Sequence, residues 1–248
     1  MIQRPTVTTS SSPAATGKLW SLKELEGFRI LATDGDIGKV HDFFFEDQSW
    51  AVRYLVVDTG HWLPGRKVLL PTPMLLGPHP QEKTFAVTLT REKVKTSPDV
   101  DTDKPVSRIR EIELHTHYDW PFHWGMVGAW VGSVPPIPPI EPPPSYGEED
   151  RGASHLRSVR EMTGYHVEAA DGPLGGVDDF IADDKSWGVR YLMILTTKLS
   201  RRRKVAIAPD CLDGPISWAE HRVSLKLTLE NIEKLPEWNP AKTHPQGG

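Results

Sequence analysis

The order of apolar and polar residues in this chain predicts short β-strands joined by tight turns. Apolar stretches end at turn signals such as Asp34-Gly35 and Asp47-Gln48-Ser49, and glycine accepts the positive φ that tight turns need. The stretch 50–58 is apolar on both faces, which indicates a central strand covered on both sides. After Thr90, a good N-cap, the pattern becomes that of a short helix. We expect strands within residues 27–36, 38–47, 50–58, 66–71 and 84–89, and a helix within 90–98.

The same pattern occurs twice in the chain. The stretch "DQSWAVRYLVVDTG" at 47–60 returns as "DKSWGVRYLMILTT" at 184–197, 137 positions later. With this offset, 18 of the 39 residues from Ser21 to Thr59 are identical in the second copy. The second copy then has one inserted residue, and beyond it the match continues as far as Pro98, which aligns with Pro236. A duplicated unit of this size is large enough for a small hydrophobic core.

The repeat predicts two domains with connecting and terminal segments. Short strands followed by one helical turn are typical of a small, partly open β-barrel. We therefore expect a mainly β protein with two small barrels in tandem, a short helix after each, and a connector rich in proline and aromatic residues. The expected boundaries are a disordered tail at 1–18, the first barrel at 19–98, the connector at 99–157, the second barrel at 158–238 and a tail at 239–248.

The repeated unit resembles the PRC-barrel family. The stretch "DGDIGKVHDFFFEDQSWAVRYLVVDTGHWLPGRKVLLP" has a Gly after the turn, Val-x-Asp-Phe, a Trp-x-Val-Arg-Tyr-Leu strand and a Lys-Val-x-x-Pro strand. The resemblance covers about 21–98 and, more weakly, 158–236. It implies two barrels of this type. The family includes the cytoplasmic domain of the photosynthetic reaction-centre H subunit and the C-terminal domain of a ribosome-maturation factor. Its members share a barrel and differ in what they bind, so the resemblance implies no single activity.

Several repeated residues are expected at the rim or in the core of the barrels. Arg53 and Arg190 lie on otherwise apolar strand faces, so we expect each guanidinium to bind a carboxylate or carbonyl groups. Asp42 and Asp179 are the candidate carboxylates. A ligand-binding role of the two arginines is the alternative. The aromatic residues expected beside them are Trp50, Trp187, Tyr54 and Tyr191.

The connector between the repeats has a different composition. Residues 104–118 have apolar residues at helical spacing after Pro105, which predicts a helix, and 134–150 have the composition of a polyproline II spacer. Between them lies an aromatic cluster that would be an apolar liability if it were exposed. We expect it to fold back onto the barrels, and the alternative is a partner-docking patch. The candidate docking residues, with two from the loop after the 50–58 strand, are His61, Trp62, Trp120, Phe122, Trp124 and Trp130.

Two clusters in the sequence could bind ions. His115, His117 and His123 are weak candidates for a metal site, because the first two point about 200° apart on a continuous helix. The loop at 198–204 is basic, whereas its counterpart in the first repeat is apolar. We expect a solvated turn, and the alternative is contact with phosphate of lipid headgroups or RNA. The candidate anion-binding residues are Lys198, Arg201, Arg202, Arg203 and Lys204.

Composition and motifs argue against catalysis. The net charge of −4 does not favour a surface that coats nucleic acid, and the single Cys211 fits a reducing compartment. No apolar run is long enough to span a membrane, and the N-terminus has no signal-peptide core. The sequence contains no phosphate-binding loop, and no nucleophile beside a base or converging pair of carboxylates can be recognised. We expect no enzyme activity, no cofactor and a cytoplasmic location, with the inner face of the membrane as the alternative.

Three hypotheses for the function remain at this point. The first is a non-catalytic binding and assembly module that acts through contacts with an unidentified protein, its two barrels packed as a pseudo-dimer within one chain. The second is an accessory to membrane photosynthetic electron transfer (the light reaction), like the reaction-centre H subunit. The third is a ribosome or RNA maturation factor, although direct binding of nucleic acid is not favoured by the charge.

Overall fold

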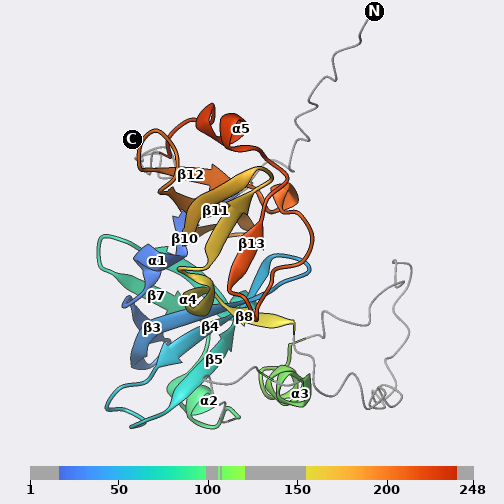
Figure 1. Ribbon diagram of the computed structural model, residues 1–248. Coiled ribbons are helices and arrows are strands. Elements are labelled where there is room, and N and C mark those ends of the chain that lie inside the picture. Colours follow the sequence, from blue (N-terminus) through green and yellow to red (C-terminus); the bar gives the residue numbers. More distant parts are fainter. Residues whose placement is uncertain (1–16, 99–105, 107, 121–154, 239–248) are drawn as a thin grey trace, which may run out of the picture.

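The computed structural model describes residues 17–98, 106, 108–120 and 155–238. These residues form two β-sheets with a few short helices, so the prediction of a mainly β fold is confirmed (Figure 1). No helix in the described ranges is long and apolar enough to cross a membrane. The expected polyproline spacer and nearly all of the two expected tails lie outside the described residues.

The first repeat, residues 19–98, contains the predicted strands and some short elements that the sequence pattern did not predict. One sheet has the order β5-β4-β3-β2-β7-β6. The helix α3, in the connector, lies beside α2 at the lower end of the molecule (Figure 1), where the His117 Nε2–H donates to the Lys93 carbonyl at 2.8 Å. The elements of this repeat are β1 (Leu19–Ser21), α1 (Leu22–Leu25), β2 (Arg29–Ala32), β3 (Gly35–Glu46), β4 (Ala51–Asp58), β5 (Lys67–Pro71), a 3₁₀ turn (Thr72–Met74), β6 (Leu75–His79), β7 (Thr84–Val87) and α2 (Arg91–Lys95), and the connector helix is α3 (Arg108–His117).

The second repeat, residues 156–238, repeats this order without a counterpart of β6. Its sheet has the order β12-β11-β10-β9-β13, in the upper half of Figure 1. The elements are β8 (Leu156–Ser158), α4 (Val159–Met162), β9 (His166–Ala169), β10 (Gly172–Asp183), β11 (Val189–Thr196), β12 (Arg203–Ile207), a 3₁₀ turn (Pro209–Cys211), β13 (Arg222–Ser224) and α5 (Leu229–Glu233).

The two repeats exchange their first strands. The strand β1 of the first repeat pairs antiparallel with β10, and β8 of the second repeat pairs in the same way with β3. The registers are equivalent, because Ser21 lies opposite Ile181 and Ser158 lies opposite Phe44. The helix that follows each exchanged strand also packs on the other repeat, α1 on β10 and α4 on β3. Each sheet is therefore completed by a strand from the other repeat.

A serine and an aspartate hold each exchanged segment in place. Ser158 Oγ and the backbone N–H of Arg160 donate to the buried carboxylate of Asp42, at 2.5 and 3.0 Å. In the equivalent place, Ser21 Oγ and the backbone N–H of Lys23 donate to Asp179, at 2.5 and 3.1 Å. Each serine oxygen also caps its own short helix by accepting a backbone N–H three residues later. We call these two sets of contacts the serine–aspartate clasps.

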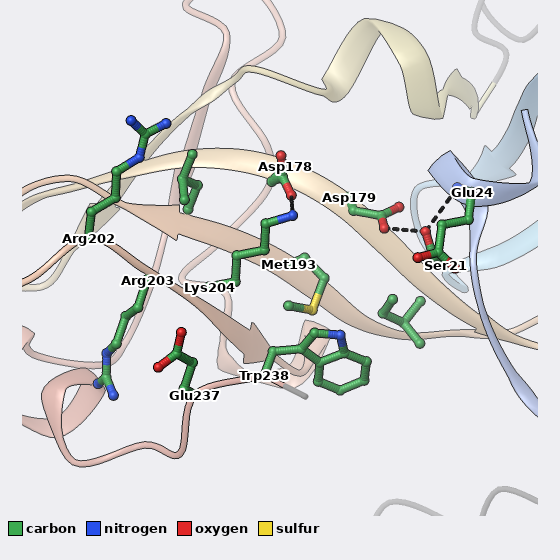
Figure 2. A pocket seen from close by; sticks show the side chains of 12 residues that line it. Ser21, Glu24, Asp178, Asp179, Met193, Arg202, Arg203, Lys204, Glu237 and Trp238 are labelled. Carbon is green, nitrogen blue, oxygen red and sulfur yellow. Dashed lines mark hydrogen bonds and ion pairs between the residues drawn. The ribbon is translucent and has the colours of Figure 1, made fainter. Parts of the chain in front are cut away.

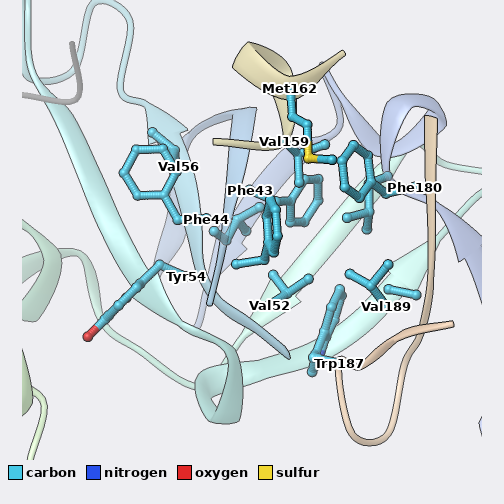
Figure 3. Close-up of a cluster of buried hydrophobic side chains, with 14 of the residues drawn as sticks. Phe43, Phe44, Val52, Tyr54, Val56, Val159, Met162, Phe180, Trp187 and Val189 are labelled. Atoms are coloured by element: carbon cyan, nitrogen blue, oxygen red, sulfur yellow. The ribbon is translucent and has the colours of Figure 1, made fainter. Parts of the chain in front are cut away.

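The repeats also meet at the turns that follow β3 and β10. Ala51 and Gly188 occupy the same position in the two repeats and pair with each other, so a pseudo-two-fold axis passes between them. Trp187 enters the first repeat, where its ring lies 6.3 Å from Phe43 and 5.8 Å from Phe85. Figure 3 shows Phe43, Phe180 and Trp187 gathered in this region. The buried apolar residues of both repeats consequently form one continuous core.

The repeated turn residues have structural roles. Asp34 accepts the first backbone N–H of α2 from Arg91, and Asp171 does the same for α5 at Leu229. At Gly38 the backbone of β3 lies so close to β4 that an added Cβ would be 2.1 Å from the carbonyl oxygen of Asp58. In the second repeat, a Cβ added to the equivalent Gly175 would be 2.0 Å from the carbonyl oxygen of Leu195. The repeated glycine is therefore required by the close approach of two strands.

We predict that Gly38→Ala destabilises the protein far more than Gly27→Ala. Both glycines have positive φ, at 135° and 78°, but only the Cβ at Gly38 would meet the backbone of a neighbouring strand. The positive φ alone costs about 1 kcal/mol, and the clash adds to it, giving a loss of about 3 kcal/mol or more for Gly38→Ala. Urea unfolding of the two variants measures the difference. Equal losses would contradict the close approach.

We also predict a pH-dependent effect of Asp42→Asn. Burial raises the pKa of Asp42 from 3.8 to about 6, although the donors from Ser158, Arg160 and Phe43 oppose the shift. The folded protein therefore holds this proton more tightly than the unfolded chain. The stability contributed by the protonated carboxyl is complete below pH 4 and is lost as the pH rises through 6, by about 3 kcal/mol.

The Asn variant lacks this titration. Relative to the parent protein, its free energy of unfolding should rise between pH 4 and pH 7, as measured by urea unfolding across this range. Glu82→Gln, at an exposed position, is the control and should show no such change. A difference between Asp42→Asn and the parent that stays constant over the range would show that this carboxyl does not titrate there.

Candidate functional site

The structure gives Arg203, one of the predicted anion-binding residues, a different role. Its guanidinium is buried and donates to the carbonyls of Ile232, Glu233 and Leu235 at 2.9, 2.7 and 2.9 Å. These carbonyls lie at the C-terminal end of α5, where a helix leaves acceptors without intrahelical donors. The equivalent Arg66 donates to the carbonyls of Lys95, the last residue of α2, and of Ser97. The repeated Arg-Lys-Val motif therefore contains a helix-capping arginine.

Two of the four other cations of the loop have acidic partners. Lys204 lies 2.7 Å from Asp178, which also binds Lys23 at 2.9 Å. Burial alone would raise the pKa of Asp178, but the two lysines lower it below its usual value. Arg201 contacts Glu237 at 3.5 Å, with both side chains largely exposed. Lys198 and Arg202 are exposed and have no acidic partner within the described part of the chain.

A cavity of about 370 Å³ lies between this loop and the exchanged helix α1. Its walls come from β10, β11, β12, α1 and the segment after α5, as Figure 2 shows. We call it the β10–β12 groove. Its lining residues are Ser21, Glu24, Asp178, Asp179, Ile181, Met193, Leu195, Arg202, Arg203, Lys204, Glu237 and Trp238.

The groove has an apolar floor and a charged rim. Leu192 and Ile194 of β11 belong to the core, so Met193 and Leu195 point to the opposite face of the sheet. Met193 is fully buried at the bottom, whereas Leu195 and Trp238 are partly exposed. The guanidinium of Arg202 lies apart from the Lys204–Asp178 pair in Figure 2. The arrangement offers apolar contact and, at Arg202, a positive charge without an acidic partner among the described residues, which suits binding better than chemistry.

The corresponding face of the first repeat is covered. Tyr54 of β4 is fully buried beneath α3, its ring 6.4 Å from His115 and 5.8 Å from Trp120 in edge-to-face geometry. Tyr191, its equivalent, is only partly buried and packs against Trp238.

Two further pairs of positions show the same difference. Leu69 of β5 is buried, whereas the equivalent Ala206 of β12 is partly exposed. Leu195 takes the place of the exposed Asp58. The second repeat thus keeps an apolar residue at a partly exposed position where the first repeat has a carboxylate. The two repeats therefore differ on this face, where the described connector helix α3 covers Tyr54 of the first repeat.

The described candidate docking residues have different surroundings in the structure. Trp120 packs against His115 with parallel rings 4.3 Å apart, so it helps to seal the first repeat. Trp62 lies under the guanidinium of Arg91 at 4.8 Å, and His61 is exposed beside it. The remaining candidates, Phe122, Trp124 and Trp130, lie outside the described residues.

The histidine candidates do not converge in the described structure. His115 is buried, and its Nδ1–H donates to the Trp120 carbonyl at 3.1 Å. His117 donates to the carbonyl of Lys93, in a different direction. Within the described ranges no three His, Cys, Asp or Glu side chains form a metal-binding group, and His123 lies outside those ranges.

The prediction that Asp42 and Asp179 bind the repeated arginines was wrong. Arg53 binds Glu46 at 2.6 Å and Arg190 binds Asp183 at 2.7 Å, within the hairpin of its own repeat. Burial alone would raise the pKa of Asp183, but donors from Ser186, Lys185 and Arg190 lower it. Asp42 and Asp179 are occupied by the clasps described above, which connect the two repeats. A carboxylate seven residues before each arginine was the signal in the sequence, because a hairpin brings these positions together.

We predict that Arg203→Gln and Arg202→Gln have very different effects on stability. Losing the buried guanidinium leaves the carbonyls at the end of α5 without donors, which costs about 2–4 kcal/mol. Arg202 is exposed, and its replacement should change stability by no more than about 0.5 kcal/mol. Urea unfolding measures both values, and Arg66→Gln serves as the equivalent of Arg203→Gln in the first repeat. A tolerated Arg203→Gln would contradict the capping role.

Comparison with known protein families gives one assignment. The family model for the PRC-barrel domain matches residues 20–94. A search of the curated proteins found no match. The matched range starts within the exchanged strand β1 and ends within α2, so it spans the sheet of the first repeat together with the segment that this repeat contributes to the other one. The chain therefore contains a PRC-barrel domain at residues 20–94, as its sequence motifs predict.

Proposed function

We propose that this protein is a non-catalytic binding and assembly module that holds a protein partner on the β10–β12 groove. The observation that carries the proposal is the difference between the repeats. The same sheet face is sealed by α3 over Tyr54 in the first repeat and left partly open around Tyr191 and Leu195 in the second. An apolar face on a rigid scaffold, rimmed by charged side chains, is the usual form of a docking site.

The roles of the reactive side chains support the non-catalytic part of the proposal. Asp42 and Asp179 are buried in the clasps, and His115 and His117 each donate to a backbone carbonyl. Burial raises the pKa of the Cys211 thiol, which disfavours the reactive thiolate. Within the described part of the chain, the two aspartates and the two histidines are thus committed to structural contacts.

A cytoplasmic location belongs to the same proposal. Contact with the inner face of a membrane, as in the photosynthetic light reaction, and a role in ribosome or RNA maturation are the competing functions. They predict different neighbours for the groove: anionic lipid and membrane subunits in the first case, ribosomal particles in the second. The proposal is therefore tested by identifying what the groove touches in cells.

We predict site-specific crosslinking from the groove to a protein. A photoreactive phenylalanine analogue in place of Leu195 should form covalent adducts with a discrete protein in living source cells. The same residue in place of Leu76, which is 65% exposed on the first repeat, is the matched control and should form none. Mass spectrometry of the adducts identifies the neighbour.

Three results would count against the proposal. The first is an absence of adducts at position 195. The second is crosslinking to lipid, with membrane co-fractionation that high salt abolishes. The third is crosslinking to ribosomal components, with sedimentation in ribosomal fractions. The last two would support the competing functions named above.

A further inference from the structure

We infer that the partner segment in the β10–β12 groove is an amphipathic α-helix with acidic residues along one edge. This inference rests on the proposed function and names the chemistry of the partner. It is carried by two independent observations. One is the element that covers the equivalent face in the first repeat, and the other is the charge at the rim of the groove.

The first repeat shows what kind of element this sheet face accepts. The helix α3 and the residue after it bury four side chains, Glu111, Leu114, His115 and Tyr118, and the ring of His115 lies against Tyr54. Their spacing of three, four and seven residues places them on one face of a helix. Since β10–β12 repeat the register of β3–β5, the second sheet presents the same pleated surface to a partner.

The second repeat keeps the features that such a helix would need. Tyr191 and Leu195 lie on the same strand face and are partly exposed, beside Trp238. In the first repeat, α3 leaves the equivalent tyrosine with no exposed surface. A helix in the groove would bury Tyr191, Leu195 and Ala206 against its apolar side chains, as anchor residues bury theirs in known helix-in-groove complexes.

The charge at the rim selects the sign of the partner. Glu237 binds Arg201 and Asp178 binds two lysines, so these acidic groups of the lining are already neutralised. Arg202 is exposed and has no acidic partner among the described residues. An acidic residue on the partner helix would complete this pair, and a basic residue there would be repelled.

The test uses peptides with the sequence of the helix that covers the first repeat. The probe is a fluorescein-labelled peptide with the sequence of residues 106–120, VSRIREIELHTHYDW. Two variants change only side chains that are exposed on α3, Arg110→Glu for an acidic peptide and Glu113→Lys for a basic one. Binding to the full-length protein is measured by fluorescence anisotropy at low and at physiological salt.

The acidic peptide should bind about threefold or more tightly than the basic one, with a preference that weakens in salt. Arg202→Glu should reverse the preference between the two peptides, and Lys39→Glu, an exposed charge reversal on the first repeat, should leave it unchanged. Leu195→Asp should weaken binding of every peptide about tenfold or more. Leu195→Asp introduces the residue type that the first repeat has at the equivalent position, Asp58, so the strand should tolerate the substitution.

Other results would overturn the inference. Equal binding by the parent and Leu195→Asp would place the peptide outside the groove. Self-association that Leu195→Asp abolishes would make a second copy the occupant. If the peptide binds only after residues 121–134 are deleted, that segment competes with the peptide and is itself the occupant of the groove. Vesicles containing phosphatidylserine that bind through Arg202, while no peptide binds, would indicate a lipid surface.

The crosslinking experiment separates this inference from the proposed function. If position 195 crosslinks to a protein but neither charged peptide binds, the helical acidic partner is wrong and the docking function stands. If position 195 crosslinks to nothing and no peptide binds, both are wrong.

Discussion

The structure depends on the exchange of the first strand between the two repeats. Without β8, the strand β3 would lose a hydrogen-bonded neighbour along Phe44–Glu46, and β10 would lose β1 in the same way. The buried carboxylates of Asp42 and Asp179 would also lose the serine hydroxyls and backbone N–H groups that hold them. Leaving a buried carboxylate without these donors is costly, so the two repeats stabilise each other and each is incomplete alone.

The exchange constrains some surfaces of each repeat more than others. Near the pseudo-two-fold axis, where Ala51 pairs with Gly188, both copies must keep compatible side chains because each packs on the other. The face that carries Tyr54 or Tyr191 lies away from this contact and is free to differ. One copy of this face is covered by α3, and the other forms the β10–β12 groove. The two repeats thus share their central contact and differ on this face.

The sequence predicted the parts of the fold that depend on local pattern. Strand alternation and the Asp-Gly turns indicated β2 to β5, and the Thr90 cap indicated α2, because these signals act over a few residues. The exchange was not predicted, since β1 spans only Leu19–Ser21 and strand pairing 160 residues apart leaves no local periodicity. The repeated Ser21/Ser158 and Asp42/Asp179 were visible as identities, but their contact across repeats was not.

The same limit applied to the candidate site: local sequence signals were visible, and contacts between distant residues were not. The divergence of the 198–204 loop drew attention to a segment that lines the β10–β12 groove, but the charges of this loop were counted without their partners. Asp178 binds Lys204, and the carbonyls at the end of α5 bind Arg203, so only three-dimensional contacts show that Arg202 is exposed at the rim without an acidic partner among the described residues. The helix α3 was predicted from Val106, Ile109, Ile112 and Leu114, yet the described side chains it buries are Glu111, Leu114 and His115, because polar groups also face the sheet.

Cleavage of the chain between the repeats tests the reciprocal exchange most directly. A specific protease site placed within residues 134–147 allows the purified protein to be cut after folding, and size-exclusion chromatography with light scattering then gives the mass of the product. The exchange predicts a single particle of the uncut mass that separates only under conditions that unfold it. Two fragments that elute separately, each still folded by circular dichroism, would contradict the account.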